Sequence, residues 1–206
     1  MKLLILGATG RVGTEITRMA IADQHDVKVL VRSPGKLAVP PDALTVVQGN
    51  VLHQKDLSEA MNGVDIVISA LNTDKNDTLS RSMPLIIQEM SDQDLDRLIM
   101  VGTAGILNSR TESERYRFQS SESKRRSTTA AEDHLAAYRS LKQSDLKWSV
   151  VCPTALIDGR AEGHYRVERD YLPENGKRIS VGDTAEFVYS LLGQEEYIYS
   201  RVGIAY

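Results

Sequence analysis

The chain has 206 residues, and its 25 Lys and Arg residues against 28 Asp and Glu residues give a formal net charge of −3. Hydrophobic residues make up 41% and charged residues 26% of the chain, a balance typical of globular proteins and unlike that of disordered ones. The slight excess of acidic residues argues against a nucleic-acid partner and against an anionic membrane surface.

Cysteine content and hydropathy favour a cytoplasmic location. The single cysteine, Cys152, cannot form an internal disulfide. The apolar run 3–6 is too short for the core of a signal peptide, and no stretch approaches the roughly 18–20 apolar residues that span a bilayer. We expect a cytoplasmic monomer or weak homodimer with a small-molecule substrate and no membrane partner.

Short apolar runs alternate along the chain with longer amphipathic segments. The runs are rich in β-branched residues and nearly uninterrupted, which predicts strands buried on both faces of a parallel sheet. The predicted strands are 2–6, 27–31, 44–47, 64–68, 98–101 and 148–152, and the predicted helices are 11–22, 55–61, about 77–90, 126–142 and 182–192. This alternation predicts βαβ units and a doubly wound α/β fold.

Three segments depart from the regular alternation. The connection between the second and third strands contains Pro34, Pro40 and Pro41, so at most a short helical turn fits there, with Ser33 before Pro34 at its start. The polar segment 108–126 is either a solvated surface loop or a mobile lid over a site. Segment 163–180 alternates loosely around a predicted turn at 173–176. We expect one domain over 1–206, with 108–126 and 154–181 added on its substrate side.

A glycine-rich motif follows the first predicted strand directly. Gly7–Gly13, GATGRVG, opens the first predicted helix with glycines three residues apart, which is the context of a dinucleotide-binding turn. Gly7 permits the tight turn, Gly10 lets the backbone approach the phosphates, and Gly13 allows close packing of helix on sheet. The helix N-terminus offers its N–H groups to the pyrophosphate. The motif therefore predicts a Rossmann fold with strand order 3-2-1-4-5-6.

The end of the second predicted strand indicates which dinucleotide binds. NAD-specific sites usually place an acidic residue there to bind the ribose 2′-hydroxyl. This chain has Arg32 and Ser33, with Lys36 close behind. Because a guanidinium favours the 2′-phosphate, we predict NADP(H) as the cofactor, and a solvated arginine is the plain alternative. Asn50, after the third strand, is expected to accept a hydrogen bond from the adenine amino group.

With these motifs placed, the chain resembles an atypical short-chain dehydrogenase/reductase, and within that group the NADPH-dependent flavin reductase/biliverdin-IXβ reductase type. The resemblance extends over nearly the whole chain. It is carried by GATGRVG (7–13), VLVRS (29–33), GNVLHQKDL (49–57), GVDIVISALNTDKND (63–77), VGTAG (101–105), EDHLAAYRSLKQSDLKWSVVCPT (132–154) and EGHYRV (162–167).

The resemblance implies a set of residues that contact NADP(H). They are Gly7, Thr9, Gly10, Arg11, Val12, Arg32, Ser33, Asn50, Val51, Leu71, Asn72 and Thr73. It also places Thr103 beside the nicotinamide, where it would polarise the acceptor or fix the carboxamide, and it places Cys152, Pro153 and Thr154 on the other side of the ring. His134 matches a histidine of the resembled type and either faces the pocket or is structural.

Departures from the family pattern restrict the chemistry. Asn50 stands where the family usually has Asp. The Tyr-x-x-x-Lys pair of the wider superfamily has one literal match, Tyr138 with Lys142, but the apolar stripe around Tyr138 predicts a core position. A working pair would lie near 120–125, and Tyr116 has no Lys four residues later. The loop after the sixth strand lacks the His of relatives, which counts against tetrapyrrole reduction specifically.

We therefore predict an NADPH-dependent reductase that transfers hydride from the nicotinamide to a flavin, quinone or similar conjugated acceptor. Thr103 and His134 are the candidate catalytic residues, Cys152 is expected as a buried thiol, and no metal cluster is predicted. With such acceptors the proton can come from solvent, so the protein contributes mainly binding and orientation. Two other classes stay open: a noncatalytic NADP(H) sensor similar to NmrA-type regulators, and an isomerase- or epimerase-like enzyme that uses bound NAD(P).

Overall fold

The computed structural model describes residues 1–73, 77–123 and 127–206. Its main sheet has the strand order β3-β2-β1-β4-β5-β6-β10-β8, and β7 pairs with β9 in a small second sheet. The strands of the main sheet are β1 Lys2–Leu6, β2 Asp26–Val31, β3 Thr45–Gln48, β4 Ile66–Ser69, β5 Arg97–Val101, β6 Lys147–Pro153, β8 Arg166–Arg169 and β10 Ser200–Ala205. The second sheet consists of β7 Ala155–Ile157 and β9 Arg178–Ser180. The helices are α1 Arg11–Ala22, α2 Gln54–Met61, α3 Thr78–Asp92, α4 Thr129–Lys142 and α5 Val181–Ser190.

The first six strands confirm the predicted Rossmann arrangement. They are parallel and follow the order 3-2-1-4-5-6. The predicted helix 11–22 has the predicted ends, and α4 begins at Thr129, while the predicted start of that helix at Arg126 lies outside the described residues. The chain then returns from its C-terminal third into the sheet, where β10 runs parallel to β6 and β8 pairs antiparallel with β10.

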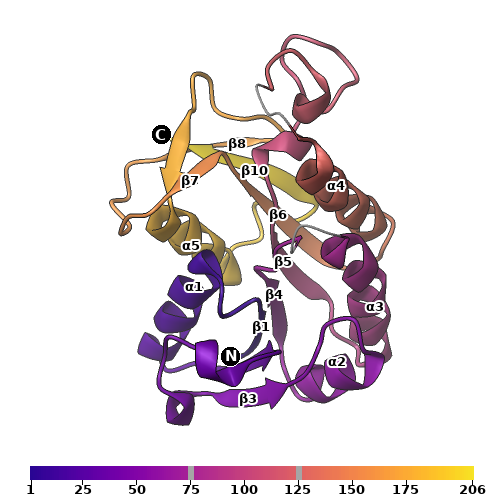
Figure 1. Cartoon of the computed structure of the whole chain (residues 1–206), viewed down its shortest axis with the longest axis vertical. Helices are drawn as coiled ribbons and strands as arrows, with labels where there is room; N and C mark the ends of the chain where they lie inside the picture. Colours follow the sequence, from indigo (N-terminus) through magenta and orange to yellow (C-terminus); the bar gives the residue numbers. More distant parts are fainter. Residues whose placement is uncertain (74–76, 124–126) are drawn as a thin grey trace.

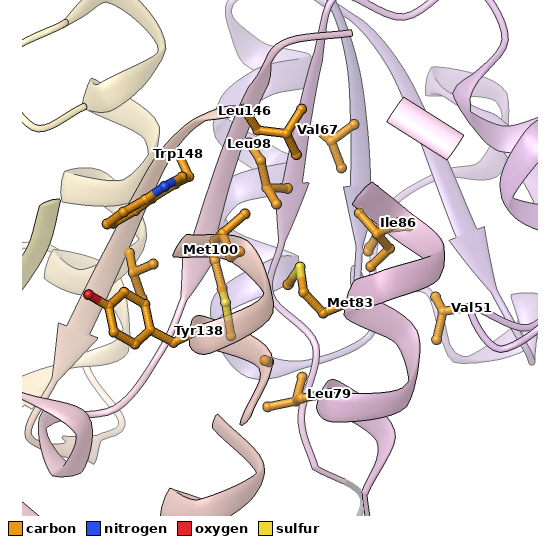
Figure 2. Packing of buried hydrophobic residues seen from close by; sticks show 14 of the residues in the cluster. Val51, Val67, Leu79, Met83, Ile86, Leu98, Met100, Tyr138, Leu146 and Trp148 are labelled. Carbon is orange, nitrogen blue, oxygen red and sulfur yellow. The ribbon is translucent and has the colours of Figure 1, made fainter. Parts of the chain in front are cut away.

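Helices cover both faces of the sheet (Figure 1). On one face lie α1 and α5, and on the other lie α2, α3 and α4. Figure 2 shows the second face, where apolar side chains of α3 pack against those of β4 and β5. The central side chains of this contact are Leu79, Met83 and Ile86 from α3, with Val67, Leu98 and Met100 from the strands.

Tyr138 lies in this core, as predicted. Its side chain is 4% exposed, and its ring packs edge-on to Trp148 with ring centroids 5.6 Å apart. Burial raises the pKa of the Tyr138 hydroxyl because it penalises the phenolate. Burial of the Tyr138 ring agrees with the predicted core position, and our interpretation of the Tyr138–Lys142 spacing as accidental stays a prediction.

The described part of segment 108–126 is held by its own hydrogen bonds. Glu122 accepts hydrogen bonds from Ser109 Oγ at 2.6 Å and from Arg110 N at 2.8 Å. Phe118 is 8% exposed and anchors the loop in the core. The loop is thus fastened to the body of the protein in this structure, and its role as a lid stays a prediction. Residues 124–126 lie outside the described part.

A buried carboxylate organises the C-terminal segment. Asp183, in the first turn of α5, is fully buried and accepts hydrogen bonds from the backbone N–H groups of Glu162 and Gly163, both at 2.8 Å. The hydroxyls of Ser180 and Tyr206 also donate to it, at 2.7 and 2.5 Å. Burial alone would raise the pKa of Asp183, but these hydrogen bonds outweigh that effect and hold the pKa below its ordinary value.

None of the helices in the part of the chain that the structure describes combines the length and the apolar character needed to cross a membrane.

The Asp183 network predicts a pH-dependent contribution to stability. Because the carboxyl pKa is lower in the folded protein than in the unfolded chain, Asp183 stabilises the fold above pH about 4, and this contribution disappears as the pH falls through the folded-state pKa. We expect Asp183→Asn to lower the free energy of unfolding by about 1–3 kcal/mol at pH 7, and the difference from wild type to shrink toward pH 3. Urea denaturation at both pH values measures this difference.

The exposed Asp145→Asn variant is the control and should match the wild type throughout. A difference between Asp183→Asn and the wild type that stays constant from pH 7 to pH 3 would contradict the role given to the carboxylate.

Candidate functional site

A hollow of about 260 Å³ opens where the carboxyl ends of β1, β2, β3 and β4 meet. This edge is where open α/β sheets bind ligands. Many of the predicted cofactor residues line the hollow: Gly7, Thr9, Gly10, Arg32, Asn50, Val51, Leu71 and Asn72. Sequence reasoning missed other lining residues, namely Leu30, Val31, Gly49, Leu52, Ala70 and Thr78. Val31, Gly49, Leu52 and Ala70 each lie next to a predicted contact, so extending each motif by one position would have found these four, but not Leu30 or Thr78.

The glycine-rich turn forms the floor of the hollow. Gly7 has φ +84°, and a Cβ there would lie 2.4 Å from the Ala70 carbonyl oxygen, so the turn requires glycine for both its conformation and its contact with β4. Gly10 N donates to the Gly7 carbonyl at 2.9 Å and closes the turn. These features confirm the tight turn that the motif predicts.

Gly10 leaves room for a ligand. A Cβ on Gly10 would lie 3.2 Å from Gly7 O, a tight contact, and 3.9 Å from Ala70 O, an ordinary one. Gly10 also lines the hollow, so its lack of a side chain keeps this part of the hollow open. Gly10 is also the N-cap of α1, where no side chain caps the helix among the described residues. The first N–H groups of α1 therefore suit an anion. The turn Gly7–Gly10 and the first N–H groups of α1 together form a cradle that fits the pyrophosphate of a dinucleotide.

The end of β2 gives the hollow a positive charge. Arg32 lines it and is exposed, and no carboxylate is among the described residues that line it. Ser33 and Lys36 are exposed just beyond, at the start and end of the short helical turn Pro34–Lys36. The turn was predicted with Pro34 at its first position, although the Ser33 side chain makes no capping hydrogen bond.

Asp56 organises the loop after β3. Its Oδ2 accepts a hydrogen bond from Asn50 N at 2.8 Å, and a Cβ on Gly49 would lie 2.7 Å from its side chain. Asn50 Oδ1 in turn accepts a hydrogen bond from Leu52 N at 3.1 Å. A carbonyl oxygen has two lone pairs, so this bond is compatible with the predicted contact to adenine, which stays a prediction.

Arg11 and Val12 lie outside the hollow. Val12 is 7% exposed and packs in the core beneath the turn. Arg11 lines a neighbouring, shallower hollow of about 320 Å³, where its Nη1 donates to Asp158 Oδ1 at 3.0 Å. Both side chains of this ion pair are mostly exposed, so it stabilises the fold little. A contact between Arg11 and the phosphates stays a prediction.

The residues predicted around the nicotinamide are mostly buried, and so are the predicted cofactor contact Thr73 and the candidate catalytic residue His134. Thr73, Thr103 and His134 are 4%, 7% and 9% exposed, Pro153 is buried and Thr154 half-buried. None of them lines either hollow described above. Thr103 Oγ1 accepts a hydrogen bond from Gly105 N at 3.4 Å. Contacts of these side chains with a nicotinamide, and a catalytic role for Thr103 or His134, stay predictions.

Cys152 lies fully inside the core, as expected. Burial raises the pKa of its thiol to about 12, so the thiol is protonated at neutral pH. Its role beside the nicotinamide stays a prediction. The described residues contain no group of three His, Cys, Asp or Glu side chains arranged to hold a metal ion.

Comparison of the sequence with protein-family models identifies the family of this chain. The model of the NAD(P)H-binding family matches residues 7–195, from the glycine-rich turn to beyond α5. The chain belongs to the NAD(P)H-binding family. The matched segment begins at the glycine-rich turn, and nucleotide binding at the hollow beside Gly10 stays a prediction.

Individual relatives are distant or partial. A stretch of 81 residues is 38% identical to photosystem II assembly factor Ycf39 of Synechocystis, covering 39% of this chain and 25% of that protein, so the chain spans about a quarter of that relative's length. A Streptococcus pneumoniae structure, suggested to be an NADH-flavin reductase, is 24% identical with TM-score 0.83 and covers 100% of this chain and 99% of its own. A Bacteroides thetaiotaomicron structure, suggested to be an epimerase, is 25% identical with TM-score 0.86 over 100% and 96% of the two chains.

Gly10→Ala tests the cradle directly. The new methyl group would lie beside the hollow and 3.2 Å from the Gly7 carbonyl oxygen, a tight contact, so we expect a modest fall in melting temperature and about a tenfold or greater loss of affinity for both NADPH and NADH. Isothermal calorimetry measures both affinities. Gly193→Ala is the control, because a Cβ there meets no atom within 4 Å and Gly193 lies outside the hollow. Unchanged nucleotide affinity in Gly10→Ala would show that the cradle is not part of the nucleotide-binding site.

Proposed function

We propose that this NAD(P)H-binding protein is an NADPH-dependent oxidoreductase that passes hydride to a flavin, a quinone or a similar conjugated acceptor. The observation that carries the proposal is the hollow over the glycine-rich turn, with Arg32 at its β2 edge and no carboxylate among its described lining residues.

The preference for NADPH rests on charge. A dinucleotide held by the turn would extend its adenosine half toward the ends of β2 and β3, where Arg32 and Asn50 line the hollow. A guanidinium forms charge-assisted hydrogen bonds with the 2′-phosphate of NADPH. The neutral 2′-hydroxyl of NADH offers it only a weaker interaction. Ser33 and Lys36 are exposed close by and add donors for the same 2′-phosphate.

The chain's own residues bind and orient rather than transfer protons through a tyrosine. Bound NADPH would supply a hydride from C4 of its nicotinamide. The glycine-rich turn and the N-terminus of α1 would hold the pyrophosphate, and Leu71 and Asn72 would continue the site toward the nicotinamide. Thr103 would polarise the acceptor or fix the carboxamide, and His134 would lie on the acceptor side.

Burial of Tyr138 favours conjugated acceptors over simple ketones. Ketone reduction in the wider superfamily uses a tyrosine as proton donor, but in this chain the Tyr138 ring is in the core and its pKa is raised. A flavin or quinone that accepts a hydride can take its accompanying proton from solvent. The fold similarity to a Streptococcus pneumoniae protein suggested to be an NADH-flavin reductase supports the same choice.

Arg32→Ala tests the cofactor preference. Loss of a charge-assisted contact worth about 1.5–3 kcal/mol predicts roughly 10–150-fold weaker binding of NADPH and little change for NADH. Dissociation constants from calorimetry give both values. Arg18→Ala, which removes an exposed arginine on α1, should change neither. Equal losses for the two nucleotides in Arg32→Ala would refute the assignment.

The reaction itself is tested by NADPH oxidation, followed at 340 nm without oxygen, in the presence of FMN, FAD or quinones. We expect turnover with at least one of these acceptors, and its loss in Gly10→Ala. Tight NADPH binding without oxidation by any of them would contradict the proposed reaction and favour a nucleotide sensor. Rearrangement of a small metabolite with no net NADPH consumption would favour an epimerase, the activity suggested for the Bacteroides thetaiotaomicron protein.

A further inference from the structure

A carboxylate from α4 caps the start of α3. Asp133 is 6% exposed, and its two oxygens accept hydrogen bonds from Leu79 N at 3.1 Å and from Ser80 N at 2.9 Å. Asp77, the N-cap residue of α3 itself, makes no side-chain capping hydrogen bond, and its carboxylate lies 3.7 Å from Arg81 Nη1 instead. The cap of α3 is thus supplied from another helix.

This arrangement makes the first turn of α3 depend on α4. The first N–H groups of a helix have no partner within the helix, and a carboxylate at that end also interacts favourably with the helix dipole. Asp133 is 54 residues from Leu79 in sequence, so this cap forms only when α4 is packed in place. The two helices lie side by side on the same face of the sheet (Figure 1).

The capped turn is also a wall of the nucleotide site. Thr78, the first residue of α3, lines the hollow together with Leu71 and Asn72 from the preceding connection. On α4, the residue after Asp133 is His134, the candidate residue on the acceptor side. The Asp133 carboxylate therefore joins the wall of the nucleotide hollow to the helix that carries His134.

We propose that Asp133 is a positioning residue: by capping α3 it fixes the wall at Thr78 for nucleotide binding and ties that wall to α4. Its effect on nucleotide affinity rests on membership of the NAD(P)H-binding family. Its effect on turnover rests on the proposed reductase function.

Asp133→Asn tests the cap with little change of shape. The amide replaces one acceptor oxygen by an NH₂ group facing a backbone N–H, so the first turn of α3 loses part of its cap. The matched control is Glu89→Gln, because Glu89 is a buried carboxylate in the last turn of the same helix, 5% exposed and bonded to the side chains of Gln54 and Gln93. Both variants should melt at lower temperature than the wild type.

NADPH affinity, measured by calorimetry well below each melting temperature, separates positioning from simple stabilisation. We expect Asp133→Asn to bind NADPH at least about fivefold more weakly than the wild type, and Glu89→Gln to bind it with wild-type affinity. Wild-type affinity in folded Asp133→Asn overturns the proposal, and so does an equal loss in both variants. Wild-type protein that binds NADPH but reduces no acceptor would defeat the proposed reaction while leaving this binding test intact.

Hydrogen–deuterium exchange on the wild type decides the question if Asp133→Asn fails to fold. Addition of NADPH should protect residues 78–82 of α3 and 131–137 of α4 together, and should leave the far end of α3 at 88–92 unchanged. Protection at 78–82 without any at 131–137 would overturn the proposed link between the wall and α4.

Discussion

The close approach of the turn after β1 to the end of β4 is the constraint on which the site depends. Gly7 adopts φ +84° with its α-carbon packed against the carbonyl of Ala70, a distance that no Cβ would permit. A Cβ on Gly13 would likewise lie 2.2 Å from the Gly7 carbonyl oxygen, so α1 starts directly above the turn. This packing directs the N-terminus of α1 over the sheet edge and leaves the space beside Gly10 open. The hollow is a consequence of that backbone geometry, with side chains adding selectivity at its rim.

Hydrogen bonds to three carboxylates then fix two loops and a helix end. Asp56 holds the loop after β3, Asp133 holds the start of α3, and Asp183 holds the segment at 162–163. Each carboxylate accepts backbone N–H groups of a loop or helix end that would otherwise lack partners. Asp56 and Asp133 therefore hold segments that line or adjoin the hollow, and among the described residues that line it the charge comes from Arg32.

Local patterns made much of this predictable. The strand–turn–helix motif at 2–22 determines the ends of β1 and α1, and the alternation of buried strands with helices leads to the order 3-2-1-4-5-6 because right-handed crossovers allow few others. The lining residues found in advance follow strands directly, and parallel strands end at one edge. Contacts between distant segments left no local signal: β10 pairs with β6 through Val202 and Val151, and Arg11 meets Asp158 across 147 positions. The burial of Thr103 and His134 is another product of such packing.

The most direct measurement of the central claim is a calorimetric titration of the purified, nucleotide-stripped protein with NADPH and with NADH. If the backbone cradle binds the pyrophosphate and Arg32 binds the 2′-phosphate, NADPH will bind saturably, with one molecule per chain, and more tightly than NADH. Absence of saturable binding for both nucleotides would contradict the account at its foundation.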